Sequence, residues 1–147
     1  MIERLLYISE SQLSQSEAPS VVSDIVKGSL RKNVALDLTG ALFFTGIHFA
    51  QILEGPSEQI DQLLGAIHRD IRHTNISLIE RIPIHARKFP DWGMAYYGPL
   101  SFITKHILDV LYCEEGPERH LATERLMDLA HELSVWRMLD EGAVANG

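Results

Sequence analysis

The run at 47–54, Ile-His-Phe-Ala-Gln-Ile-Leu-Glu, ends at the pair Gly55-Pro56, and this junction constrains the fold more than any other feature of the chain. An apolar and β-branched run stopped by Gly-Pro predicts a strand that turns at once into the next element. Because side chains alternate along a strand, Phe49, Gln51 and Leu53 share one face. An amide buried there without partners costs about 1–3 kcal/mol. Whatever covers this face must therefore offer Gln51 both a donor and an acceptor.

The same patterns predict five strands and four helices along the chain. Strands are expected at 4–9, 38–45, 48–54, 75–84 and 92–97, and helices at 21–33, 56–71, 102–111 and 118–139. Thr45-Gly46-Ile47 joins the second and third strands as a hairpin. Pro83 places the end of the fourth strand at an edge or an irregular position, because proline cannot donate to a sheet ladder. The second helix has the clearest apolar stripe: Ile60, Leu63, Leu64, Ile67 and Ile71.

This order predicts an α+β sandwich of ferredoxin-like type, βαββαββ, with a five-stranded mixed sheet. The helix between the first two strands implies a right-handed crossover with those strands as parallel neighbours. Both early helices are expected on one face of the sheet. The two late helices are amphipathic and are expected to cover the other face.

Charge and composition exclude several classes of protein. The net charge is −7, and residues 114–141 carry eight acidic residues against three arginines. An acidic surface repels phosphate backbones, so we expect no direct nucleic-acid binding. No apolar run has the length of about 18 residues that a membrane span needs, and the N-terminus lacks a signal peptide's apolar core, which predicts a cytoplasmic protein with no membrane partner. The single Cys113 excludes an internal disulfide.

Four polar residues converge on one side of the predicted sheet. Tyr7 and Gln51 occupy neighbouring strands, Asn33 ends the first helix and Asp70 ends the second. Each has an ordinary structural explanation: the phenol fills space, Asn33 stops a helix, Gln51 bonds a neighbouring backbone group, and Asp70 pairs with a nearby arginine. Taken together, they indicate a flat ligand with amide-like edges between the helices and the sheet.

The residues at these positions resemble the BLUF family, flavin-binding sensors of blue light. The resemblance covers about residues 2–98. Each segment alone is weak, but their joint order and spacing are specific. The segments are Arg4-Leu-Leu-Tyr-Ile-Ser9, Ser29-Leu-Arg-Lys-Asn33, Leu38-Thr-Gly-Ala-Leu42, Phe49-Ala-Gln-Ile-Leu-Glu-Gly-Pro56, Asp70-Ile-Arg-His73 and Arg87-Lys-Phe-Pro-Asp-Trp-Gly-Met94.

The resemblance implies a noncovalent flavin, FAD with FMN as the alternative, held between the two early helices. Tyr7 matches the family's electron donor and Gln51 its switching glutamine. Trp92 and Met94 match strand positions linked to signal output. The residues expected around the cofactor are Tyr7, Ile25, Lys32, Asn33, Gln51, Asp70, Arg72 and His73. The implied domains are a flavin-binding domain at 1–98, a helical cap at 99–141 and a flexible tail at 142–147.

The resemblance also implies a mechanism. The excited flavin takes an electron and then a proton from Tyr7, which phenylalanine could not supply, and Gln51 rearranges by rotation or tautomerisation. The flavin ends chemically unchanged but more strongly hydrogen-bonded, which predicts a small red shift that reverses in the dark. Two positions depart from the family: Lys32 replaces a short polar residue, and Ala66 replaces an arginine found in several members. Lys32, Arg69 or Arg72 could then meet the cofactor's phosphates.

Two other functions stay open on the sequence. An enzyme on this scaffold is disfavoured, because no His-Glu-x-x-His motif and no phosphate-binding Gly-rich loop occurs, and no metal site is expected. A flavin-free interaction module is the second alternative, and it would purify colourless. We expect signalling to a separate effector, such as a cyclic-di-GMP enzyme or a transcription regulator, with Trp136 and the acidic helix face as candidate contacts. Whether the chain forms homo-oligomers is left open.

Overall fold

The protein is described by a computed structural model that covers residues 2–90, 93, 95–98 and 101–146, with side chains described at all of these except 101, 102 and 134–146. Trp92 and Met94, the predicted output residues, lie outside the described residues, as does the side chain of Trp136. The strands are β1 (Ile2–Ser11), β2 (Thr39–Phe44), β3 (His48–Pro56), β4 (His73–Ile84) and β5 (Ala95–Tyr97). The helices are α1 (Ala18–Ala35), α2 (Ser57–Arg69), α3 (Ser101–Tyr112) and α4 (Pro117–Asn146).

The five strands form one mixed sheet in the order β4-β1-β3-β2-β5. Antiparallel pairing joins β1 to β3, β1 to β4 and β2 to β3, while β2 pairs with β5 in parallel. The expectation that β1 and β2 are parallel neighbours was wrong. They run in the same direction, but β3 lies between them, because β3 returns from the predicted hairpin and pairs with both. Pro83 lies at the sheet edge as expected, since β4 is an outer strand.

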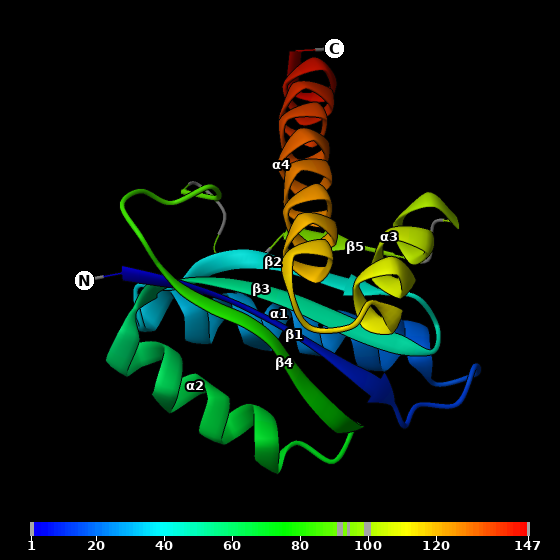
Figure 1. Ribbon diagram of the computed structural model, residues 1–147. Helices are drawn as coiled ribbons and strands as arrows, with labels where there is room; N and C mark the ends of the chain where they lie inside the picture. Colours follow the sequence, from blue (N-terminus) through cyan, green and yellow to red (C-terminus); the bar gives the residue numbers. More distant parts are fainter. Residues whose placement is uncertain (1, 91–92, 94, 99–100, 147) are drawn as a thin grey trace.

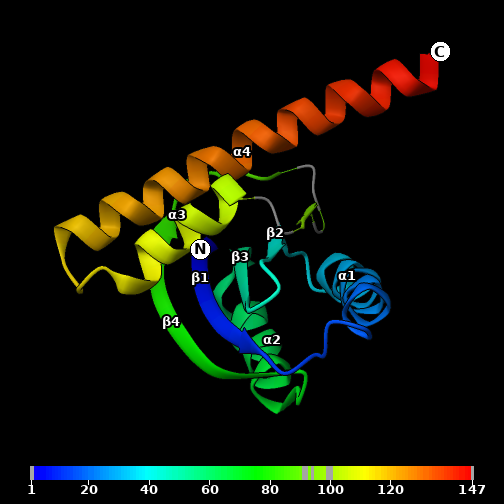
Figure 2. The same cartoon turned by 90° about the vertical axis from the view of Figure 1, so that its right-hand side faces the viewer.

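Helices cover both faces of the sheet (Figure 1, Figure 2), and a hydrophobic core lies under each pair of helices. On one face, Leu5, Tyr7, Phe49 and Leu53 pack with residues of α1 and α2 such as Val22, Ile60 and Leu63. On the other, Leu6, Ile8, Ala50 and Ile52 pack against α3 and α4 through Ile103, Ile107, Val110, Leu126 and Ala130. Strand alternation divides these two sets, so the predicted sandwich with the late helices on the opposite face is confirmed.

The backbone at Gly55, between β3 and α2, leaves no room for a side chain. Its φ is 155°, and a Cβ there would lie 2.6 Å from Leu38 Cδ2 and 2.8 Å from the backbone oxygen of Asp37. The strand therefore reaches Pro56, and α2 begins at Ser57.

Helix ends differ from the sequence expectation. Ile71 does not belong to the stripe of α2, because the helix ends at Arg69 and Asp70 is extended, which leaves Ile71 89% exposed. The last helix, expected to end at 139, runs to Asn146, and Figure 1 shows its C-terminal end reaching beyond the sheet. No helix within the described ranges is long and apolar enough to cross a membrane.

Candidate functional site

The centre of the site is a hydrogen bond between Tyr7 and Gln51. The two residues are directly opposite each other in the antiparallel pairing of β1 with β3. Both point to the α1 and α2 face, and each is only 4% exposed. The Tyr7 hydroxyl donates to Gln51 Oε1 over 2.6 Å. The phenol and the amide that the sequence placed on one face thus meet directly.

The protonation of Tyr7 is fixed by its surroundings. Burial raises the pKa of the Tyr7 phenol well above its usual value, and the negative charge of Asp70 raises it further. The hydroxyl therefore keeps its proton at physiological pH and remains a donor to Gln51.

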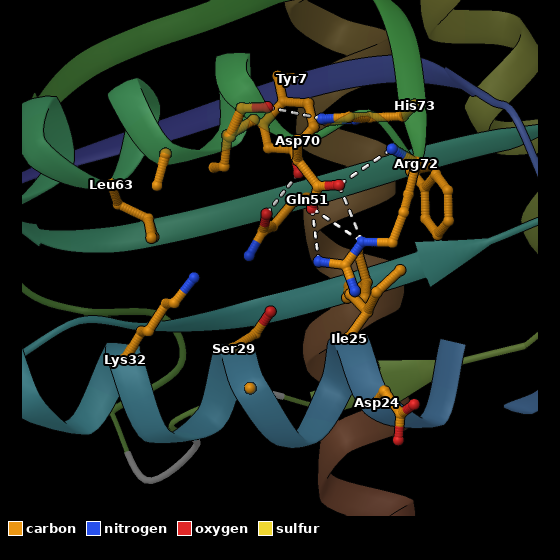
Figure 3. Close-up of a pocket in the computed structure, with 15 residues that line it drawn as sticks. Tyr7, Asp24, Ile25, Ser29, Lys32, Gln51, Leu63, Asp70, Arg72 and His73 are labelled. Carbon is orange, nitrogen blue, oxygen red and sulfur yellow. Dashed lines mark hydrogen bonds and ion pairs between the residues drawn. The ribbon is translucent and has the colours of Figure 1, made fainter. Parts of the chain in front are cut away.

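A crevice opens beside this pair, between α1, α2 and the sheet (Figure 3). Its empty volume is about 660 Å³, open solvent included. Its walls carry most of the predicted cofactor residues together with several that the sequence did not single out. The lining residues are Tyr7, Asp24, Ile25, Gly28, Ser29, Lys32, Leu42, Phe49, Gln51, Leu63, Ala66, Ile67, Asp70, Arg72 and His73.

The side-chain amide of Gln51 uses its oxygen in the bond to Tyr7, and its nitrogen is left to donate to another group. Because the Tyr7 hydroxyl occupies Oε1, the Nε2 group is left to donate elsewhere. Figure 3 shows this nitrogen directed across the crevice toward Ser29 and Lys32 of α1. Within the described part of the chain, Nε2 has no hydrogen-bond acceptor. A ligand in the crevice would therefore meet an N–H donor from Gln51.

Asn33 behaves differently from the prediction of a helix stop. It lies inside α1, two residues before the helix ends, and is fully buried. Its Nδ2 donates to the backbone carbonyl of Gly93 over 2.7 Å, so the amide orientation is fixed, because a carbonyl can only accept. Its Oδ1 is buried and has no hydrogen-bond partner among the described residues. Asn33 is absent from the crevice lining, although its neighbour Lys32 is part of it.

Asp70 and Arg72 form a bidentate pair at the mouth of the crevice. Arg72 Nε lies 2.8 Å from Oδ1 of Asp70, and Nη2 lies 2.6 Å from Oδ2. Hydrogen bonding to Arg72 holds the pKa of the Asp70 carboxyl below its usual value. The pairing of Asp70 with a nearby arginine, considered from the sequence, is confirmed, and both residues line the crevice.

His73 lines the crevice with both ring nitrogens engaged. Nδ1 lies 2.7 Å from Ser9 Oγ, and Nε2 lies 2.8 Å from the backbone oxygen of Ile67. Sequence reasoning did not select Ser9 or Ser29, because a lone serine carries no distinctive pattern. The contact of Ser9 with His73 is visible only in the folded structure, where β4 begins beside the end of β1 and opposite Ser11.

The side chain of Glu54 lies on the face of the sheet opposite to Gln51. Its carboxylate is fully buried and accepts from Arg4 Nε at 2.9 Å, from the backbone N–H of Lys88 at 3.0 Å and from that of Phe89 at 2.7 Å. These bonds hold the segment that leads toward β5 against the strand that carries Gln51.

Comparison with known proteins agrees with this geometry. The model of the BLUF family, described as sensors of blue-light using FAD, matches residues 2–95. The family match and the fold define a sensor domain of the flavin-binding type. This chain belongs to the BLUF family of blue-light sensors.

Individual relatives support the assignment. The blue light- and temperature-regulated antirepressor BluF of Escherichia coli (strain K12) is 36% identical over 97 residues, which are 66% of this chain and 24% of that protein. The dark-state structure of BlrB, a BLUF protein, is 32% identical with a TM-score of 0.71, covering 88% of this chain and 96% of that one. Klebsiella pneumoniae BlrP1 with FMN and cyclic diGMP is 31% identical with a TM-score of 0.61, covering 67% of this chain and 26% of that one. This chain thus spans about a quarter of BluF and of BlrP1.

Proposed function

We propose that this chain is a cytoplasmic blue-light receptor that holds FAD noncovalently in the crevice between α1 and α2, with Tyr7 and Gln51 as its photoactive pair. The observation that carries the proposal is the 2.6 Å bond from the Tyr7 hydroxyl to Gln51 Oε1, which leaves Nε2 directed into the crevice. Family membership supports the cofactor class, and the hydrogen bond between Tyr7 and Gln51 supports these two residues as the ones that would act.

The residues present fit a flavin ring. Gln51 Nε2 offers a donor in the crevice and has no acceptor among the described residues. Asn33, whose buried Oδ1 also has no partner among the described residues, lies on α1 but outside the crevice lining. A ligand with a carbonyl edge in the crevice would accept a hydrogen bond from Gln51 Nε2. Gly28 lines the same wall, and a Cβ placed on it would meet no atom within 4 Å. Apolar contact would come from Ile25, with Leu63 on the opposite wall.

The chemistry of the pair follows from its hydrogen bond. A bound flavin supplies blue-light absorption and, when excited, a strong one-electron oxidant. Tyr7 is placed to give up an electron and the proton at its hydroxyl oxygen, and Gln51 Oε1 is the acceptor within hydrogen-bond reach. Rotation or tautomerisation of the Gln51 amide would then change which polar group it presents to the crevice. In a buried site such a change is costly to leave unsatisfied, so it can bias a two-state element.

FAD is proposed over FMN because the family is described by FAD, although BlrP1 was solved with FMN. Lys32 lines the crevice and forms no ion pair with any described residue, which makes it a candidate for the cofactor's phosphates. Arg72 is less available for this role, because Asp70 occupies its guanidinium.

Output is proposed to pass to a separate effector, and we propose no catalytic activity for this chain. The names of two relatives indicate the class of target: BluF is named as an antirepressor, and BlrP1 was solved with cyclic diGMP. A transcription regulator or a cyclic-di-GMP enzyme is therefore the proposed partner class.

The test is optical. The full chain, purified and supplied with FAD, should show a flavin absorption band that shifts slightly to the red under blue light and returns in the dark. Gln51→Leu should keep the flavin and lose the shift. A chain that stays colourless after incubation with FAD would favour the flavin-free interaction module, and a Gln51→Leu protein that still shifts would contradict the role of the amide.

A further inference from the structure

His73 cannot offer a free ring nitrogen to a ligand without breaking a contact with the protein. A backbone carbonyl only accepts hydrogen bonds, so Nε2 carries a hydrogen and donates to Ile67 O. In the neutral ring, Nδ1 then accepts from the Ser9 hydroxyl. The two bonds fix both the tautomer and the orientation of the imidazole.

These bonds connect three elements at one corner of the site. Ser9 lies on β1, two residues after Tyr7 and on the same face, and it is only 1% exposed. Ile67 lies in the last turn of α2, and His73 is the first residue of β4. The imidazole therefore holds the end of α2 and the start of β4 against the strand that carries the phenol.

The same ring packs directly on the photoactive side chain. The edge-on contact between His73 and Tyr7 has a centroid distance of 6.1 Å and an interplanar angle of 64°. A second edge-on contact joins His73 to Phe49 at 6.2 Å and 88°. Edge-to-face arrangements of this kind are favourable and directional. Tyr7 is thus held at its ring by His73 and at its hydroxyl by Gln51.

We propose that Ser9 and His73 form a positioning pair for the photoreaction: the Ser9 hydroxyl fixes the imidazole, and the imidazole keeps the Tyr7 ring where its hydroxyl meets Gln51. This inference deepens the proposed function and rests on it. Ser9 touches neither the crevice nor the reacting atoms, so it acts through His73. Small displacements of reacting groups reduce rates strongly, which makes the yield of the light reaction the sensitive quantity.

The test compares four variants of the flavin-loaded full chain. Ser9→Ala removes the hydroxyl, Ser9→Thr keeps it, and His73→Phe keeps a ring but removes both nitrogens. Ser23→Ala, an exposed position on α1, is the matched control. The readouts are flavin affinity, melting temperature and the yield of the red-shifted state per absorbed photon.

We expect Ser9→Ala to bind flavin within about two-fold of wild type and to lose about three- to ten-fold in yield. Ser9→Thr should recover most of that loss, His73→Phe should lose at least as much as Ser9→Ala, and Ser23→Ala should match wild type. A purely structural role would lower the melting temperature without this separation of yield from affinity. If Ser9→Thr cannot fold, the comparison of Ser9→Ala with His73→Phe still decides.

Nitrogen-15 NMR of the histidine rings tests the arrangement without light. The inference requires a His73 ring protonated at Nε2. An Nδ1–H tautomer would overturn it, and so would a Ser9→Ala yield equal to wild type or a loss that His73→Phe does not reproduce. If the wild-type chain binds flavin but shows no red shift, the proposed function itself fails and the inference falls with it.

Discussion

Asn33 on α1 donates a 2.7 Å hydrogen bond to the backbone carbonyl of Gly93, 60 positions further along the chain. Gly93 packs closely at this point, since a Cβ there would lie 2.6 Å from Leu30 Cδ1 and 3.2 Å from Val34 Cγ2. The segment that leads into β5 is therefore fastened to the helix that borders the crevice. This bond links α1 to Gly93, which lies in the sequence between the two predicted output residues.

Removing this bond should loosen the segment before β5. Asn33→Leu keeps the volume but leaves the Gly93 carbonyl without its donor, so we expect a loss of about 1–3 kcal/mol in the free energy of unfolding. Hydrogen exchange at the Phe89 and Gly93 amides should accelerate as well. Urea denaturation and exchange of the flavin-free protein measure both effects. Gln62→Ala, exposed on α2, is the control and should change neither.

Glu54 holds the same segment from the other face. Glu54→Leu leaves Arg4 without its counter-ion and two backbone N–H groups without their acceptor. Breaking a buried pair in this way costs about 3–5 kcal/mol. Glu54→Gln should cost less, because its amide oxygen still accepts from one N–H group. Equilibrium unfolding measures the difference, with the exposed Glu58→Gln as a control. Equal stability of Glu54→Leu and wild type would contradict the role of this carboxylate.

Lys32 should distinguish phosphorylated flavins from riboflavin. Lys32→Ala should weaken FAD and FMN binding by about two- to five-fold and leave riboflavin unchanged, as expected for one exposed charge pair. The effect should shrink at high salt, where exposed charges are screened. Fluorescence titration measures the affinities. Lys27→Ala, exposed on the same helix but outside the crevice lining, should have no effect. An equal loss for riboflavin would exclude a phosphate contact.

Stability should depend on pH through Asp70. Arg72 lowers the pKa of Asp70 in the folded protein below the ordinary value of 3.8. The carboxylate therefore contributes stability above about pH 3.8, and the contribution is lost as pH falls through the lower folded pKa. Urea midpoints measured between about pH 7 and pH 3 should fall less for Asp70→Asn than for wild type. Parallel curves for the two proteins would show that the pair contributes nothing to acid sensitivity.

Local patterns in the sequence predicted the elements and the two faces of the sheet well. Alternation placed Tyr7 and Gln51 on one face, and Gly55-Pro56 placed the start of α2 within a residue. The crossover rule did not predict that β1 pairs with β3. The rule gives the relative direction of β1 and β2, but it does not say which strand of the β2–β3 hairpin pairs with β1. The prediction that Ile71 belongs to the apolar stripe of α2 was wrong for a local reason. The helical spacing of apolar residues continues to Ile71, but the backbone is already extended at Asp70.

Partners of the site residues depend on tertiary contacts and could not be predicted from the sequence. Nothing in the pattern showed that Asn33 bonds Gly93 or that Ser9 bonds His73, because each pair is more than fifty residues apart. The family resemblance selected eight residues expected around the cofactor. All of these except Asn33 line the crevice in the structure. Their roles toward a cofactor remain predictions, and the roles of Trp92 and Met94 remain so as well.

The most direct measurement is the light-minus-dark absorption spectrum of Tyr7→Phe, compared with wild type and with Tyr112→Phe on the exposed side of α3. Tyr7→Phe removes only the hydroxyl that donates to Gln51 Oε1. We predict that all three proteins bind flavin, that wild type and Tyr112→Phe show the reversible red shift, and that Tyr7→Phe shows none. A red shift of normal size and reversibility in Tyr7→Phe would contradict the account.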